Sequence, residues 1–334
     1  MKEVVRAVNL DAGESMFFAR QLEYIKQQSY DILYPEYKAI TMIPVSTEAG
    51  PGAESITYRE FDTVGIMKVI SNYADDLPRA DVRGKEYTTP VRSIGGSYGY
   101  NVQEIRAARM ANKPLELRRA EAARRAYEQM VNRIGWFAKS DDGIYGGLTG
   151  LLYNANITKA DANTGDWVNP GTTADQIIYD FSTAFFAMVS LTKGVEWPDT
   201  ILIPPKQYGR LRTLPRSTIS DTTVMTFLMN AHPEIKQIEW VNELSGISPK
   251  PSTPTAIGAG GTPYASGYKT DAMVMYKKDP MKLTYEIPQP FEQFPVQERG
   301  LEYLIPTHAR VGGVICYYPL SLAIVEKIGS DTYH

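Results

Sequence analysis

The sequence has little of what several classes of function require. Its single cysteine, Cys316, excludes an internal disulfide and fits a reducing cytosol, and its three histidines leave a structural zinc site almost without ligands. No run of eighteen apolar residues is present, so no segment is predicted to span a membrane as a helix. The net charge of −3 excludes an overall positive field that would draw the whole protein onto nucleic acid.

The strongest pattern that is present is a long helix after Pro114. Its apolar residues recur at steps of three and four, which places them on one face of a helix. They are Ala120, Ala123, Tyr127, Met130, Ile134 and Phe137. Polar residues repeat the same steps on another face, with Arg124 and Glu128 four apart as an ion pair. The roughly 25 residues that follow Pro114 span about 37 Å, which is long for a helix of an ordinary domain.

Residues 36–100, before this helix, are predicted to be extended. Ile40–Pro44 is strand-like, and segments near residues 56–70 and 87–94 read as the two strands of a hairpin joined by a polar connection. This ribbon has too few aliphatic residues to form a core of its own, and an isolated hairpin is marginal in water. We therefore expect the ribbon to lie on another surface.

The remaining segments predict a mixed α+β protein. Residues 1–35 read as an arm with an amphipathic helix, and residues 173–297 as helices alternating with short strands. Within that unit, Ser245–Gly267 is predicted to be an exposed loop, and the proline-interrupted stretch Met281–Phe294 to form only edges or loops. One or two closing strands are expected between Glu302 and Ile328.

Candidate catalytic residues are few. Ser97 lies in a G-x-S-x-G sequence between a predicted strand and helix, as in the nucleophile elbow of a serine hydrolase. Such an enzyme requires several β-α units before the elbow, whereas here mainly one hairpin precedes it, so a glycine hinge is the favoured interpretation. The acid pairs Asp75–Asp76 and Asp141–Asp142 are typical of turns. We predict no catalytic residue, no cofactor and no metal.

The long helix is locally basic in an acidic protein. Four arginines carry most of this charge, namely Arg118, Arg119, Arg124 and Arg125. They are open to two interpretations: a solvated face with pairs inside the helix, or a surface that faces phosphates and binds them through charge without reading bases.

The order of arm, ribbon, long helix, α/β unit and closing strands resembles that of the tailed-bacteriophage major capsid proteins. Their fold is shared with encapsulin shells and with the floor domain of herpesvirus capsid proteins. Short phrases are also similar, namely Asp76–Arg79, Gly147–Leu151, Ile203–Tyr208 and Gly312–Ile315.

The resemblance implies a phage major capsid fold with five parts. Residues 1–35 are then the N-terminal arm and residues 36–100 the extended β-hairpin called the E-loop, centred on Ala53–Gly99. Residues 101–172 form the spine helix and the first part of the P-domain, residues 173–297 the A-domain, and residues 298–334 the returning P-domain strands.

The resemblance also implies a function and partners. Many copies would form hexamers and pentamers of an icosahedral shell around double-stranded DNA, in a virion capsid assembled in the host cytoplasm. A separate scaffolding protein, a portal and decoration proteins are the further partners; no membrane and no enzymatic activity are expected. The four helix arginines would face DNA, and the ribbon would contact the next subunit through Tyr58, Arg59, Ile66, Lys68, Arg79 and Lys85. The alternatives are an encapsulin-type compartment for protein cargo and a serine hydrolase using Ser97.

Overall fold

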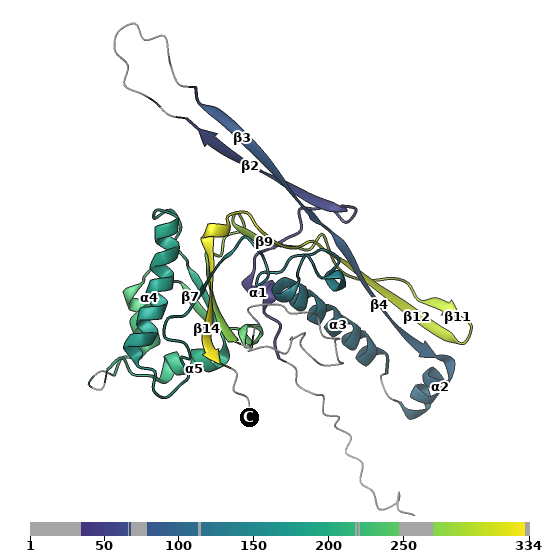
Figure 1. Cartoon of the computed structure of the whole chain (residues 1–334). Coiled ribbons are helices and arrows are strands. Elements are labelled where there is room, and N and C mark those ends of the chain that lie inside the picture. Colours follow the sequence, from purple (N-terminus) through teal and green to yellow (C-terminus); the bar gives the residue numbers. More distant parts are fainter. Residues whose placement is uncertain are drawn as a thin grey trace, which may run out of the picture. The chain divides into compact units, whose positions relative to one another are not determined.

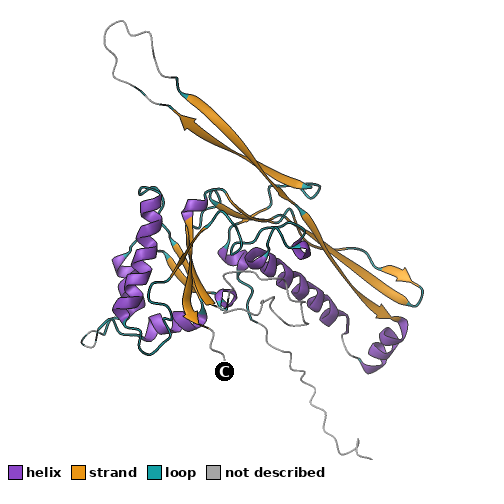
Figure 2. Cartoon of the chain, viewed as in Figure 1, coloured by secondary structure: helices purple, strands orange, loops and turns teal. Residues whose placement is uncertain are grey.

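The chain contains both helices and strands, as the sequence predicts for an α+β fold (Figure 2). The computed structural model describes residues 35–65, 67, 79–112, 115–217, 219, 221–246 and 270–330. Its elements belong to one unit, Tyr37–His334. The predicted helix of the arm, ribbon residues Ile66 and Lys68, and nearly all of the Ser245–Gly267 loop lie outside the described residues.

The predicted long helix is confirmed as α3 (Leu115–Phe137), and a second helix, α2 (Val102–Ala111), precedes it (Figure 1). Asn101 and Glu104 form a capping box at the start of α2, and Asn112 ends it in the left-handed conformation. The predicted apolar face of α3 becomes more buried along the helix, from half-buried residues near its start to Ile134 and Phe137 at its end.

Beside α3 lies a sheet in which β4 (Arg92–Asn101) pairs with β12 (Glu302–Val311) over ten antiparallel positions. The strands β10 (Gln289–Gln293) and β11 (Gln297–Arg299) pair with β12 as well.

The ribbon itself is β2 (Ser55–Val64) paired with β3 (Asp81–Pro90). The prediction that one hairpin continues through residue 94, with a glycine hinge after it, is therefore wrong. Pro90 is the last residue of β3 and pairs with Ser55, Val91 is buried, and the chain from Arg92 onwards pairs with β12 instead.

A three-stranded sheet is formed by β1 (Val45–Ser46), β9 (Leu283–Glu286) and β13 (Gly313–Cys316). Two predictions fail here. The segment predicted as strand Ile40–Pro44 begins with a short helix, α1 (Ala39–Met42), and β9 is a fully buried central strand although its stretch was expected to form only edges or loops. The α1 helix is held on α3 because the Ala39 N–H donates to Asn132 Oδ1 (3.0 Å).

The second large sheet has the order β5 (Thr158–Asp161), β14 (Leu322–Ser330), β8 (Thr270–Tyr276), β6 (Thr200–Ile203) and β7 (Gln237–Trp240). The helices next to this sheet in sequence are α4 (Ala174–Leu191), α5 (Pro205–Thr213) and α6 (Val224–Ala231). Elsewhere along the chain, short turns of 3-10 helix are η2 (Gly143–Tyr145), η3 (Asn242–Leu244) and η4 (Pro319–Ser321). Helices alternate with short strands from α4 to β8, as predicted for this part of the chain. The sheet nevertheless crosses the boundaries predicted at 173 and 298, because β5 and β14 come from outside them.

Two buried clusters stabilise these layers. One joins α3 to the three-stranded sheet and contains Trp136 and Tyr285; the other joins α4 to the five-stranded sheet and contains Phe181 and Phe185. Strand β8 serves both, since Ala272, Val274 and Tyr276 face the first cluster and Met273 and Met275 the second.

Candidate functional site

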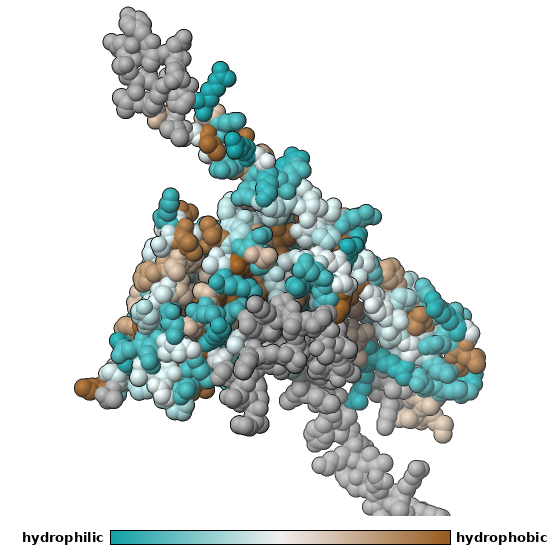
Figure 3. Space-filling model, viewed as in Figure 1, coloured by the Kyte–Doolittle hydropathy of each residue, from teal (hydrophilic) through white to brown (hydrophobic). Residues whose placement is uncertain are grey.

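The β2–β3 ribbon is the most exposed pair of strands in the described part of the chain. It has ten register pairs, from Ser55↔Pro90 to Val64↔Asp81. Every described side chain from Arg59 to Glu86 is exposed, including Phe61 (66 %), Val82 (59 %) and Met67 (99 %). Large apolar side chains at such exposure are available for contact with another surface. Figure 3 shows hydrophobic residues among hydrophilic ones along the ribbon.

Each face of the ribbon has its own chemistry, because side chains alternate along a strand. One face carries opposite charges in register, Glu60 opposite Lys85 and Asp62 opposite Arg83. The other face carries Phe61, whose ring lies over Gly84: a Cβ atom added at Gly84 would lie 3.2 Å from it. The aromatic ring therefore covers the position where the opposite strand has no side chain.

The base of the ribbon is anchored on its own chain. The Tyr58 ring stacks on Tyr87 (5.1 Å between centroids) and meets the edge of Tyr317 (4.9 Å). Burial at this contact is the main cause that raises the pKa of Tyr58. Gly312 lies under Ile56, whose Cδ1 would be 3.1 Å from an added Cβ. The ribbon thus has a packed base and an uncovered outer end.

The predicted contact residues are divided between these two parts. Tyr58 belongs to the packed base. Arg59 donates from Nε to Glu86 Oε1 (2.7 Å) across the ribbon, Lys85 lies over the Tyr87 ring (4.6 Å), and Arg79 is exposed. Their contacts with another subunit stay predictions. Phe61 was not among the predicted contact residues, because its position opposite Gly84 depends on the register of the hairpin.

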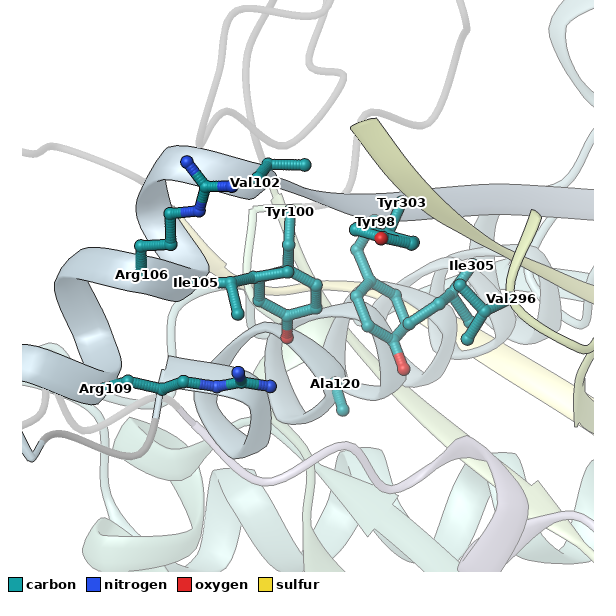
Figure 4. A pocket seen from close by; sticks show the side chains of 10 residues that line it. All are labelled: Tyr98, Tyr100, Val102, Ile105, Arg106, Arg109, Ala120, Val296, Tyr303 and Ile305. Carbon is teal, nitrogen blue, oxygen red and sulfur yellow. The ribbon is translucent and has the colours of Figure 1, made fainter. Parts of the chain in front are cut away.

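A groove of about 590 Å³ lies at the other end of β4, between α2, α3 and the β11–β12 strands. Figure 4 shows Tyr98 and Tyr100 side by side, with Ile105 next to Tyr100 and Arg109 near the edge. The lining residues are Tyr98, Tyr100, Val102, Ile105, Arg106, Arg109, Ala120, Val296, Tyr303 and Ile305. The groove is mainly apolar and aromatic, with two arginines from one helix. No sequence signal had indicated it.

The helix arginines are in different electrostatic situations. Arg119 is tied down: it pairs with Glu104 (3.0 Å), donates to the Gly99 carbonyl oxygen and lies over the Tyr100 ring (4.8 Å). The hydrogen bond from Arg119 is also the largest cause that lowers the pKa of Glu104. Arg124 pairs with Glu128 (3.1 Å), as predicted, and Arg118 and Arg125 are exposed. Of the four arginines predicted to face DNA, two therefore stabilise the protein's own helices.

The arrangement around Ser97 does not fit a nucleophile elbow. Ser97 lies in the middle of strand β4, opposite Pro306 of β12, and not at a turn between a strand and a helix. It lines a second cavity, of about 300 Å³, together with His308, but no aspartate or glutamate is among the described lining residues. The third member of a catalytic triad is thus missing there.

The described part of the chain has neither a cluster of metal-ligating side chains nor a membrane-spanning helix. It contains no group of three or more His, Cys, Asp or Glu side chains that could hold a metal ion. None of its helices is long and apolar enough to cross a bilayer.

Comparison with known proteins gives matches at the levels of sequence family and fold. The profile of the major capsid protein family matches residues 65–328. The capsid of Myoviridae phage XM1 is similar over 93% of this chain and 99% of that one, with a TM-score of 0.78 and 17% identity. A structure from Gordonia phage Cozz is similar over 98% of this chain and 98% of that one, with a TM-score of 0.60 and 12% identity. A structure from Mycobacterium phage Ogopogo is similar over 93% of this chain and 99% of that one, with a TM-score of 0.60 and 11% identity. Comparison with curated protein sequences gives no significant match.

Proposed function

Because the chain belongs to the major capsid protein family, we propose that its copies form hexamers and pentamers of an icosahedral shell that encloses double-stranded DNA. The family and the fold shared with phage capsids make it a structural protein of the virion and not an enzyme. The ring assembly, the DNA content and the partners go beyond what the family and the fold establish.

Shell assembly is supported by the difference between the two ends of the ribbon. Its base is fixed on its own chain by the Tyr58 contacts, while its outer end exposes Phe61, Val82 and Met67. An exposed two-stranded ribbon is only marginally stable in water and gains burial when it lies on a neighbour. The same heterologous contact, repeated from copy to copy, closes a ring if the rotation is suitable.

We assign the contact with DNA phosphates to Arg118 and Arg125. Both are exposed on α3. Substitution of Arg119 or Arg124 would in addition break an ion pair that holds the protein's own helices. Contacts with phosphates alone carry no sequence information, which suits a shell that packages any sequence. A scaffolding protein, a portal and decoration proteins are the further partners that such a shell would use.

The experiment is electron microscopy of the purified protein, combined with nuclease treatment of particles from infected cells. We expect closed shells and, inside full particles, DNA that is protected from nuclease. Arg118→Glu with Arg125→Glu should form shells and retain less DNA, and the difference from the wild type should shrink as salt rises, because salt screens the phosphate contacts that the substitutions remove. A protein that stays monomeric under all conditions would refute shell assembly. Shells that enclose protein cargo without DNA would favour the encapsulin alternative.

A further inference from the structure

The first half of helix α3 leaves open space between itself and the sheet that contains β4 and β12. The groove of about 590 Å³ lies beside Ala120 and Tyr98, near the start of the helix. The cavity of about 300 Å³ comes next along the same two elements, beside Ala123 and Gly96. Only further along, at residues such as Ile134, is the helix buried. The two spaces therefore follow one another along a single helix–sheet interface.

These spaces are bordered by small residues on both sides of the interface. Helix α3 contributes alanines and strand β4 contributes glycines, namely Ala120, Ala123, Ala126, Gly95 and Gly96. Well-packed protein interiors contain few voids larger than a water molecule, so two neighbouring ones at a single interface are unusual. An apolar cavity excludes water and binds apolar molecules that fit it. The interface is thus suited to a flexible apolar chain.

The open end of this interface carries a positive charge. Figure 4 shows the Arg109 side chain directed to the same side of the groove as the hydroxyl group of Tyr100, whereas Arg106 points the other way. Arg109 is exposed and forms no ion pair with another described residue. Glu104, the acidic residue of α2, is already held by Arg119 (3.0 Å). An anionic group at the open end would therefore meet an available cation.

The charge and the shape of the interface together indicate a class of ligand. We propose that the space between α3 and the β4–β12 sheet binds a free, long-chain anionic amphiphile such as a fatty acid. Its carboxylate pairs with Arg109, and its alkyl chain runs past Tyr98 towards Gly96. A neutral apolar molecule would leave Arg109 without a counter-charge, and a small inorganic anion would leave the apolar lining uncovered. The site lies apart from the β2–β3 ribbon and adds a small-molecule ligand to the proposed shell function.

The first test is calorimetric titration of purified full-length subunits with hexanoate, octanoate and decanoate. The affinity should rise about four-fold with each added methylene group, because each one that enters the interface is removed from water. An affinity that does not depend on chain length, or no binding of decanoate, would overturn the proposal. The titration uses subunits, so its outcome is independent of whether shells form.

Two variants separate the contribution of the head group from that of the chain. Arg109→Gln should weaken the binding of all three carboxylates about ten-fold and keep the dependence on chain length, because it removes a hydrogen bond to a charged group. Ala123→Leu fills the inner cavity, so decanoate should then bind no more tightly than octanoate. If Ala123→Leu does not fold, Ala126→Val, which adds a smaller side chain to the same cavity, replaces it.

The matched control removes a positive charge elsewhere. Lys193→Gln, at an exposed position after α4, should leave the affinity for decanoate unchanged. An equal loss in Lys193→Gln and Arg109→Gln would show that only the overall charge matters and would refute the site. Binding to phosphatidylglycerol vesicles without binding of monomeric decanoate would also refute it, since the ligand would then be a membrane surface and not a free amphiphile.

Discussion

Shortening the ribbon tests whether its outer end serves assembly and not the fold. The proposed variant removes residues 60–85 and joins Arg59 to Glu86 through an Asn-Gly turn, which suits a two-residue hairpin. It keeps the Arg59–Glu86 pair (2.7 Å) and the Tyr58 contacts with Tyr87 and Tyr317. The cut also spares Val91, whose buried side chain a deletion through residue 94 would remove.

The expected effect on stability is small. Every described side chain in the removed segment is exposed, and changes at such positions shift the free energy of unfolding by about 0.5 kcal/mol at most. Tyr58→Ala is the contrasting variant. It loses two aromatic contacts, each contributing about 0.5–1.5 kcal/mol, together with half-buried area, so about 1–3 kcal/mol is expected.

Urea unfolding of dissociated subunits measures the change in the free energy of unfolding, and light scattering with electron microscopy measures assembly. The shortened variant should unfold at the wild-type urea concentration and form no shells. Normal shells from it would refute the role given to the ribbon. A loss of more than about 2 kcal/mol would instead mean that the outer end belongs to its own chain's fold.

Three further predictions concern the interior. Asn132→Ala should cost about 2–4 kcal/mol in urea unfolding, because it leaves the buried N–H groups of Ala39 and Trp136 unpaired; a cost below 1 kcal/mol would contradict this. Burial raises the pKa of Glu243, and the hydrogen bond from Asn132 offsets part of this effect. The folded state therefore binds the proton of Glu243 more tightly than the unfolded state does. The free energy of unfolding should fall as pH rises above about 4.5. Glu243→Gln should make the free energy of unfolding less dependent on pH in this range. An unchanged pH dependence would contradict the role given to Glu243. Burial raises the pKa of Cys316 to about 12, so a thiol reagent should label it only after unfolding.

Local sequence patterns were sufficient to predict features that depend on a single helix or hairpin. The three-four spacing predicted the packed face of α3, which the structure confirms through the buried Ile134 and Phe137. The small number of aliphatic side chains in the hairpin predicted within residues 36–100 indicated a ribbon without a core of its own, and its described side chains from Arg59 to Glu86 are exposed. Both features follow from composition and period, which a single sequence contains.

Other features depend on partners distant in sequence. Strand β14 lies in the five-stranded sheet because Ala323 and its neighbours pair with Thr158 and Met275, and no local pattern indicates that register. The segment at Ile40 is too short for its period to distinguish a strand from a helix, and the residue that holds it on α3, Asn132, is distant in sequence. The groove was not predictable for the same reason, since its lining comes from four separate elements.

The most direct measurement of the central claim is electron microscopy of the assembled protein at a resolution that traces each chain. The account predicts closed shells in which the outer end of every β2–β3 ribbon lies on an adjacent copy. Shells in which each ribbon folds back on its own subunit, with no ribbon crossing between copies, would contradict it.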